Sequence, residues 1–103
     1  MKRLVFTMKR HWFNEIKCGN KTVEYRTIKP YWTSRIKNAL GGVLPTETTP
    51  VCPEGLVAVF SDDMFFRDVV KRRVTMIDIG ECPYPKWDGK FYRIHFEGKK
   101  VKE

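Results

Sequence analysis

The 103-residue sequence lacks any long hydrophobic run. No segment approaches the roughly 18 consecutive apolar residues that a membrane-spanning helix needs. The apolar stretch near the amino terminus, Leu4 to Met8, is too short for a secretory signal, and Lys9, Arg10 and His11 follow it at once. These absences predict a cytoplasmic protein with no membrane partner.

Cysteine and histidine are few, and their spacing does not suit metal binding. Cys18, Cys52 and Cys82 are odd in number, far apart and outside any C-x-x-C pair, which argues against a disulfide framework and a structural zinc site. The two histidines, His11 and His95, show no ligand spacing either. We therefore expect reduced thiols, no metal and no cofactor.

Acidic residues are rare in the first part of the chain. Residues 1–40 carry ten lysines and arginines but only Glu15 and Glu24, whereas residues 41–103 carry ten residues of each sign. The net charge of +8 therefore lies in the amino-terminal part. Clustered basic side chains bind polyanions because they displace counterions from phosphates, so this asymmetry predicts a nucleic-acid partner. The alternative is that the charge serves solubility alone.

The length predicts a single domain spanning residues 1–103. Helical spacing and stop signals indicate two early helices, over residues 11–19 and 30–42, and residues 62–73 suggest a short helical turn. Apolar runs or alternating patterns predict strands over residues 4–8, 21–29, 56–60, 72–80 and 91–98. Together they predict an α+β fold, a small closed or nearly closed β-barrel of about five to six strands with the helices near its mouth.

One stretch, "GNKTVEYR" from Gly19 to Arg26, places three charged residues close together: Lys21, Glu24 and Arg26. Glu24 and Arg26 lie two apart on an expected strand, so they point the same way. Lys21 has the opposite parity, and the three charges converge only if Lys21 lies in the turn before the strand or if a bulge intervenes. Otherwise they form an exposed network, which contributes only about 0–1 kcal/mol.

The same stretch resembles the G-x-K-x-x-E-x-R signature of ASCH domains, which belong to the PUA-like barrel superfamily. The flanks are similar too: Met8-Lys9 ends a first strand, a short helix with Trp12, Phe13 and Ile16 leads to the glycine, and "TIKPYW" follows. The resemblance covers about residues 4 to 97, and its specificity lies in residues 4 to 35. It implies a barrel with helices at its mouth and a cleft, lined by the signature residues, for RNA or modified nucleosides.

The resemblance also implies roles for individual residues. Lys21 would face a phosphate or a polarised carbonyl, Glu24 would accept hydrogen bonds from a base edge or orient Lys21, and Arg26 would hold Glu24 or bind the ligand. We place Lys9 and Arg10 at the rim of the cleft. Among the aromatic residues, Trp12 is expected at the rim and Tyr31 is the better candidate for stacking on an unpaired base. The expected ligand-binding residues are thus Lys9, Arg10, Trp12, Lys21, Glu24, Arg26 and Tyr31.

Some ASCH proteins are enzymes that hydrolyse the acetyl amide of N4-acetylcytidine with a lysine, a threonine and a glutamate. Lys21 matches their lysine, but Glu24 stands where they have threonine. The helical insertion that carries their glutamate has no counterpart in "TMIDIGECPYPKWDGKFY". A ribonuclease activity remains open, because a carboxylate beside a lysine can act as a general base and stabilise charge. In an enzyme, Lys21 and Glu24 would be the catalytic residues.

The leading hypothesis is a domain that binds single-stranded RNA or a modified nucleoside or nucleotide. Unpaired RNA fits better than duplex DNA because the sequence predicts no recognition helix, whereas a small cleft can accept a splayed base. A hydrolase acting on the same ligands is the first alternative. The second is a protein-interaction module that docks through the loop predicted over residues 41–55, which is rich in proline, glycine and threonine.

Overall fold

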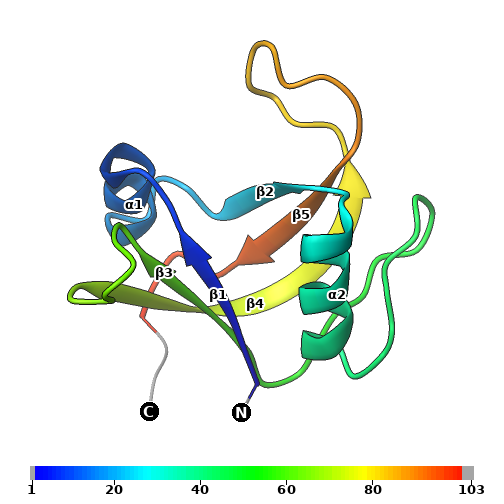
Figure 1. Cartoon of the computed structure of the whole chain (residues 1–103), viewed down its shortest axis with the longest axis horizontal. Helices are drawn as coiled ribbons and strands as arrows, with labels where there is room; N and C mark the ends of the chain where they lie inside the picture. The colour runs from blue at the N-terminus through cyan, green and yellow to red at the C-terminus, as the bar shows by residue number, and fades with distance from the viewer. Residues whose placement is uncertain (1, 101–103) are drawn as a thin grey trace.

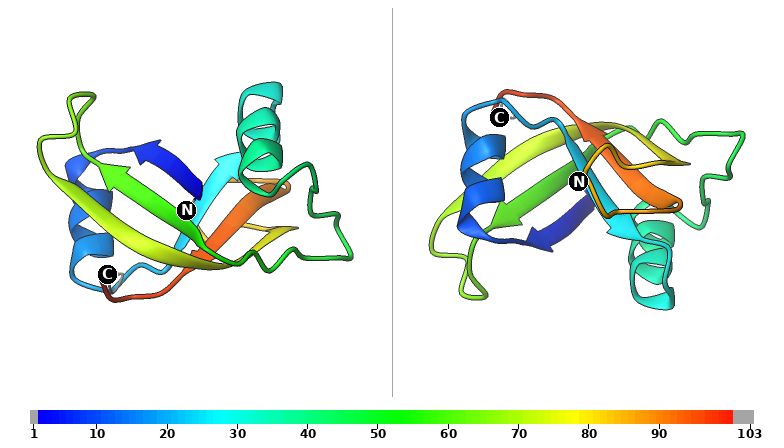
Figure 2. Two further views of the ribbon diagram at one scale, coloured as in Figure 1. Left: turned by 90° about the horizontal axis from the view of Figure 1, so that it is seen from below. Right: turned by 90° about the horizontal axis from the view of Figure 1, so that it is seen from above.

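The structure is a computed structural model that describes residues 2–100. Its elements are β1 (Lys2–Thr7), α1 (Arg10–Lys17), β2 (Val23–Thr27), α2 (Pro30–Ala39), β3 (Leu56–Ser61), β4 (Val69–Gly80) and β5 (Phe91–Phe96). The strands form one sheet in the order β1-β3-β4-β5-β2, which curls into a half-barrel with α1 and α2 on opposite sides (Figures 1 and 2). The expected α+β class with a barrel-like sheet is confirmed. No helix within residues 2–100 is long and apolar enough to cross a membrane.

The curl of the sheet depends on β4, the longest strand. Its first part pairs antiparallel with β3 and its second part with β5. A bulge between Val74 and Met76 separates the two parts, and bulges bend a strand and increase its twist. Because the bulge adds one residue, Val74 and Ile77 are both fully buried although they lie three positions apart.

Strand β3, which lies between β1 and β4 in the sheet, explains the continuous apolar run in the sequence. It pairs in parallel with β1 and antiparallel with β4, and all of its residues are buried. Because β4 begins at Val69, the helical turn expected over residues 62–73 is wrong: residues 69–73 are drawn into the sheet by pairing with β3. Residues 62–68 form the turn between these strands, with Phe65 at 80% exposure.

Helix α1 is fixed at both its buried face and its end. Phe13 and Ile16 are fully buried against the sheet. The buried Arg72 of β4 donates hydrogen bonds to the last carbonyls of the helix, at 3.4 Å from that of Ile16 and 3.2 Å from that of Lys17. The last carbonyls of a helix have no partner within the helix; that of Ile16 also accepts a hydrogen bond from the Gly19 N–H at 3.1 Å. The helix therefore ends at Lys17, two residues before Gly19.

Helix α2 begins at Pro30, whose fixed φ suits a first helical position. Its Ile36 is fully buried, and Trp32 stacks on Phe6 of β1 with ring centroids 5.2 Å apart. Phe6 in turn stacks on Phe60 of β3 at 5.3 Å. These contacts hold α2 against the open side of the sheet, beside β1.

The loop predicted over residues 41–55 is present and runs beside α2 (Figure 1). Two backbone hydrogen bonds of 2.9 and 2.8 Å join Val51 to Ile77 of β4, and Leu44 packs against the core. The loop is therefore attached to β4 through Val51.

The outer face of the sheet carries an ion cluster across β4 and β5. Asp78 accepts hydrogen bonds from Arg93 Nε at 2.9 Å and interacts with His95 Nε2 at 3.0 Å. Burial would by itself raise the pKa of the Asp78 carboxyl, but the hydrogen bonds from Arg93 and His95 outweigh it and hold that pKa below its usual range. Gly80 makes room for this cluster, because a Cβ there would lie 2.3 Å from Arg93 Cζ.

The stabilisation by Asp78 should depend on pH. The pKa of the Asp78 carboxyl is lower in the folded protein than in the unfolded chain. The stability that this carboxylate contributes is therefore fully present above the ordinary pKa of about 3.9 and is lost as the pH falls through the folded pKa. We expect Asp78→Asn to lower the free energy of unfolding by about 1.5–3 kcal/mol at pH 7. In urea denaturation this difference from wild type should shrink below about pH 4. The control is Asp88→Asn in an exposed loop, which should change the free energy of unfolding little. If Asp78→Asn differed from wild type by the same free energy of unfolding down to low pH, the role of the Asp78 charge would be refuted.

Candidate functional site

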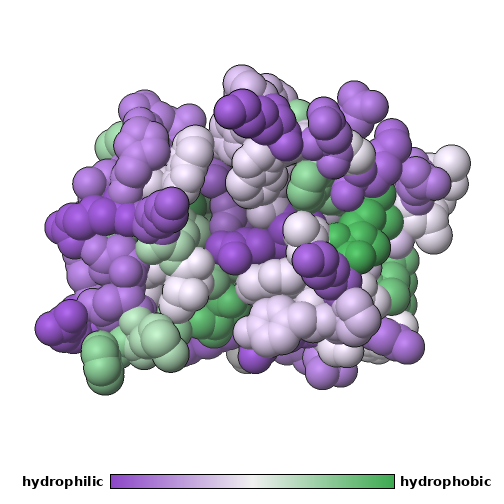
Figure 3. All heavy atoms as spheres, turned by 45° about the horizontal axis from the view of Figure 1, so that its top comes forward, coloured by the Kyte–Doolittle hydropathy of each residue, from purple (hydrophilic) through white to green (hydrophobic). Residues whose placement is uncertain are grey.

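A cleft of about 380 Å³ opens on the side of the half-barrel between α1 and α2. It lies where the two outermost strands of the sheet, β1 and β2, approach each other without pairing. A space-filling view shows hydrophilic side chains in the middle of this face, surrounded by paler and more hydrophobic ones (Figure 3). The cleft thus combines a polar floor with apolar surroundings.

Two of the floor residues come from β2. Glu24 pairs with Ile94 of β5 and Arg26 pairs with Tyr92. Ile94 and Tyr92 are both buried in the core, and directly opposed residues of an antiparallel pair share a face of the sheet. Glu24 and Arg26 consequently point to the inner face of the half-barrel.

The third floor residue, Lys21, lies in the turn before β2. Gly19 has a φ of +88°, which favours glycine, and a Cβ there would lie 3.2 Å from the Gly98 carbonyl oxygen. The turn is closed by the Lys21 N–H, which donates to the Glu15 carbonyl at 3.0 Å. Since the strand begins only at Val23, Lys21 escapes the strand alternation and turns inward.

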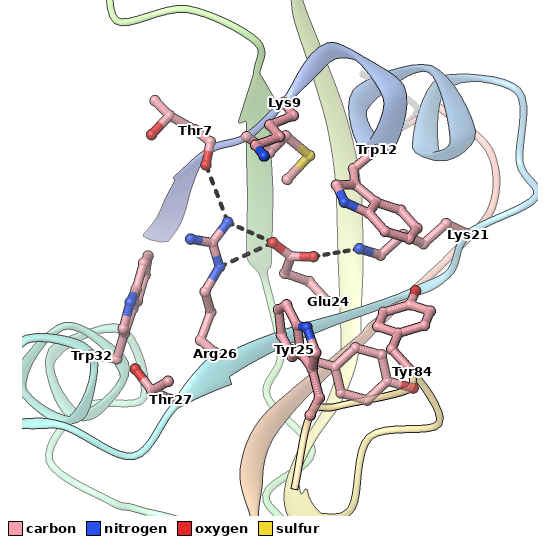
Figure 4. Close-up of a pocket in the computed structure, with 12 residues that line it drawn as sticks. Thr7, Lys9, Trp12, Lys21, Glu24, Tyr25, Arg26, Thr27, Trp32 and Tyr84 are labelled. Atoms are coloured by element: carbon pink, nitrogen blue, oxygen red, sulfur yellow. Dashed lines mark hydrogen bonds and ion pairs between the residues drawn. The ribbon is translucent and has the colours of Figure 1, made fainter.

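The three charged side chains meet at the bottom of the cleft (Figure 4). Lys21 Nζ lies 2.7 Å from Glu24 Oε1, and Arg26 Nη2 and Nε lie 2.5 and 2.9 Å from Glu24 Oε2. Arg26 Nη2 also donates to the Thr7 carbonyl of β1 at 3.2 Å. The side chains of Lys21, Glu24 and Arg26 are 10%, 6% and 21% exposed. This is a recessed cluster and not the exposed strand network that the sequence left open.

Aromatic rings form the walls of the cleft and lie against the cations. Lys21 Nζ is 4.6 Å from the centroid of a Trp12 ring, and Arg26 Cζ is 4.8 Å from that of Trp32. Trp12 contacts Tyr84 with centroids 5.0 Å apart, and Tyr84 contacts Tyr25 at 5.4 Å. A cation over an aromatic face is attracted by the negative charge of the ring surface, so the walls help to fix the floor.

Two tyrosines, Tyr25 and Tyr84, are among the residues that line the cleft. Burial, reinforced by the neighbouring Cys82, raises the pKa of Tyr25, and burial together with the nearby Tyr25 raises that of Tyr84. Both phenols therefore stay protonated at neutral pH. Each adds a hydroxyl that can donate or accept a hydrogen bond.

The structure brings most of the expected site residues together. Lys9 and Trp12 line the cleft with the three charged floor residues. Arg10 does not line it: its side chain is 68% exposed and forms an ion pair with Asp62. Tyr31 also lies outside the lining and is 59% exposed.

Four aromatic lining residues were not predicted as site residues: Tyr25, Trp32, Tyr84 and Trp87. Tyr84 and Trp87 lie on the connection between β4 and β5, residues 81–90, which contains no helix. The only local signal for them was the presence of aromatic residues in a segment rich in proline and glycine. Within residues 2–100, no group of three or more His, Cys, Asp or Glu side chains is placed to hold a metal ion.

Replacing Glu24 tests whether the cluster is a buried unit. Glu24→Gln leaves Lys21 and Arg26 close together without a counter-charge, and breaking a buried pair by removing one partner costs about 3–5 kcal/mol. We expect a loss of about 3 kcal/mol in the free energy of unfolding, measured by urea denaturation. The matched control is Glu97→Gln, whose carboxylate lies 3.9 Å from the exposed Arg73 and should cost less than about 1 kcal/mol. Equal losses in the two variants would show that the cluster behaves as a surface network.

Comparison with known proteins does not add to this geometry. No family model, no curated protein and no solved structure matches the chain. A function for the cleft is therefore inferred from its own residues.

Proposed function

We propose that the cleft binds an unpaired base of RNA, or a modified nucleoside or nucleotide. The observation that supports this most directly is the Glu24 carboxylate, held between Lys21 and Arg26 at the floor of an aromatic-walled cleft. A site of this kind offers flat apolar surfaces to a ring and fixed polar atoms to its edge. A nucleobase has both features.

The walls and the floor address different parts of such a ligand. Aromatic side chains stack on bases with about 1–3 kcal/mol per base. On the floor, Lys21 has donor hydrogens beyond the one directed at Glu24, and Arg26 Nη1 has no hydrogen-bond partner in the described chain. Glu24 Oε1 accepts one hydrogen bond, from Lys21, and a carboxylate oxygen can accept two. The floor can therefore meet both donors and acceptors of a base edge.

Size and charge restrict the ligand further. The volume of about 380 Å³ is near the lower end of the roughly 300–1,000 Å³ typical of small-ligand sites, which suits one nucleotide and not a duplex. Two cations and one carboxylate leave the floor with a positive charge, and Lys9 adds another at the rim. The cleft should therefore favour a base that carries a phosphate.

The proposal includes membership of the ASCH family with a PUA-like barrel. Its support is the arrangement of the signature residues. Gly19 allows the turn, Lys21 and Arg26 hold Glu24 from both sides, and all three charged residues line one cleft.

Hydrolysis in the same cleft is the second candidate, favoured by the 2.7 Å contact between the Lys21 ammonium and the Glu24 carboxylate. An adjacent acid and base of this kind can transfer a proton and stabilise developing charge. Incubation with labelled RNA and with acetylated cytidine separates the two candidates. Turnover that disappears in Lys21→Ala indicates an enzyme, and no turnover at high protein concentration indicates a binding module.

Trp12→Leu tests the binding proposal by removing one wall of the cleft. Loss of a stacking contact worth about 1–3 kcal/mol should weaken binding of a single-stranded RNA oligomer about 5- to 150-fold, as measured by fluorescence anisotropy. The control is Phe65→Leu, which removes an aromatic ring that is 80% exposed and not part of the cleft lining. The proposal fails if wild type binds neither RNA nor nucleotides, or if the control loses as much affinity as Trp12→Leu.

A further inference from the structure

A second hollow lies between β1 and α2. It has a volume of about 320 Å³, and its lining includes three basic residues, Lys2 and Arg3 of β1 and Arg35 of α2. The remaining lining residues are uncharged. Lys2 Nζ donates to the Asn38 carbonyl at 3.1 Å, so it lies against the carboxyl-terminal end of α2. We call this hollow the β1–α2 groove.

The positive charge of the groove has no counter-charge in the described chain. Residues 1–14 and 25–46, which include β1 and α2, contain no aspartate or glutamate. Elsewhere within residues 2–100, many basic side chains form ion pairs with carboxylates: Arg10, Lys17, Lys21, Arg26, Arg67, Arg73 and Arg93. Among these described residues, Lys2, Arg3 and Arg35 form none. Part of the excess charge of the sequence thus lies in a groove where no acidic side chain offsets it.

The groove and the cleft share two lining elements, β1 and α2. β1 contributes Thr7 to the cleft and Lys2 and Arg3 to the groove, and α2 contributes Trp32 to the cleft and Arg35 to the groove. The two hollows therefore lie at opposite ends of β1. At roughly 3.3 Å per residue, this strand is about 17 Å long.

Tyr31 connects the two hollows. Its ring lies 5.1 Å from that of Trp32 in an edge-to-face contact and 4.4 Å from Arg35 Cζ. The side chain is 59% exposed, so much of the ring is open to solvent. An exposed ring held between an aromatic wall and a guanidinium is suited to stack on a base outside the cleft.

We infer that the β1–α2 groove binds the phosphates of a single-stranded nucleic acid whose neighbouring nucleotide occupies the cleft. The inference rests on the proposed function of the cleft and extends it from one nucleotide to a strand. Lys2, Arg3 and Arg35 neutralise successive phosphates, and Tyr31 stacks on a base between the two hollows. Phosphate contacts of this kind position a strand without reading its sequence.

Charge and shape favour a nucleic-acid strand over other anionic partners. A nucleic-acid strand offers phosphates to the three cations and bases to the exposed ring of Tyr31, whereas an acidic peptide offers carboxylates but no base. A lipid surface is flat, whereas the groove is a hollow between a strand and a helix. The occupant is therefore a flexible strand that can follow the groove.

The test compares two triple variants with equal loss of charge. The groove variant carries Lys2→Gln, Arg3→Gln and Arg35→Gln; the control carries Lys71→Gln, Arg73→Gln and Lys99→Gln, which lie outside both hollows. Binding of a single-stranded RNA of about eight nucleotides, within the site sizes of small barrel domains, is measured against salt concentration. The common ribonucleoside monophosphates serve as probes of the cleft alone.

In the groove variant we expect the slope of log affinity against log salt to fall by about 2, at about 0.7 per phosphate contact on a single strand. Monophosphate binding should stay at the wild-type level, and urea denaturation checks that both variants fold. If the groove variant binds the oligomer more weakly than wild type but neither protein binds a monophosphate, the groove is supported and the proposed function of the cleft fails. Unchanged oligomer binding in the groove variant, with monophosphates bound, would overturn the groove and leave the cleft.

Three other outcomes would also overturn the groove. The first is that wild type does not bind the oligomer at all. The second is that the control weakens binding as much as the groove variant does, which would assign the effect to net charge. In the third, the groove variant keeps wild-type oligomer binding but no longer binds vesicles of phosphatidylcholine and phosphatidylserine, and the groove would then be a lipid-binding surface.

Discussion

The burial of the Glu24 carboxylate between two cations determines the geometry of the open side of the half-barrel. β1 and β2 are the outermost strands and do not pair with each other; the Arg26 side chain bridges them, bound to Glu24 on one side and to the Thr7 carbonyl on the other. Buried charges are tolerated when they are paired and hydrogen-bonded. Glu24 is the paired and hydrogen-bonded counter-charge of both Lys21 and Arg26. The floor of the cleft and the separation of β1 and β2 therefore depend on one carboxylate.

The other parts of the cleft come from segments far apart in the chain. Trp12 belongs to α1, Trp32 to α2, and Tyr84 to the connection between β4 and β5. The floor is held by the ion pairs that Glu24 of β2 forms with Lys21 and Arg26. Tyr84, in contrast, is held to Trp12 and Tyr25 through ring contacts. A ligand that enters the cleft thus meets a fixed polar floor and a wall on a connecting segment.

The sequence indicated the three charged residues of the floor but left open whether they converge. Long-range contacts decided other features that local signals did not predict. Gly19 marks the turn that frees Lys21 from the strand alternation, which is a property of a few neighbouring residues. The start of β4 at Val69 could not be predicted in this way, because pairing with β3 draws residues 69–73 into the sheet. The bulge after Val74 shifts the buried face of the same strand. The position of Tyr84 depends on the path of residues 81–90, which have no regular period.

The outer face of the sheet has a consequence for how the sequence can vary. The Arg93 guanidinium occupies the space in which a side chain at Gly80 would begin, and it is also the partner of Asp78. A larger residue at position 80 fits only if Arg93 moves or is replaced, and Asp78 then loses that partner. Positions 78, 80 and 93 are therefore expected to covary in related chains, independently of any selection on the cleft.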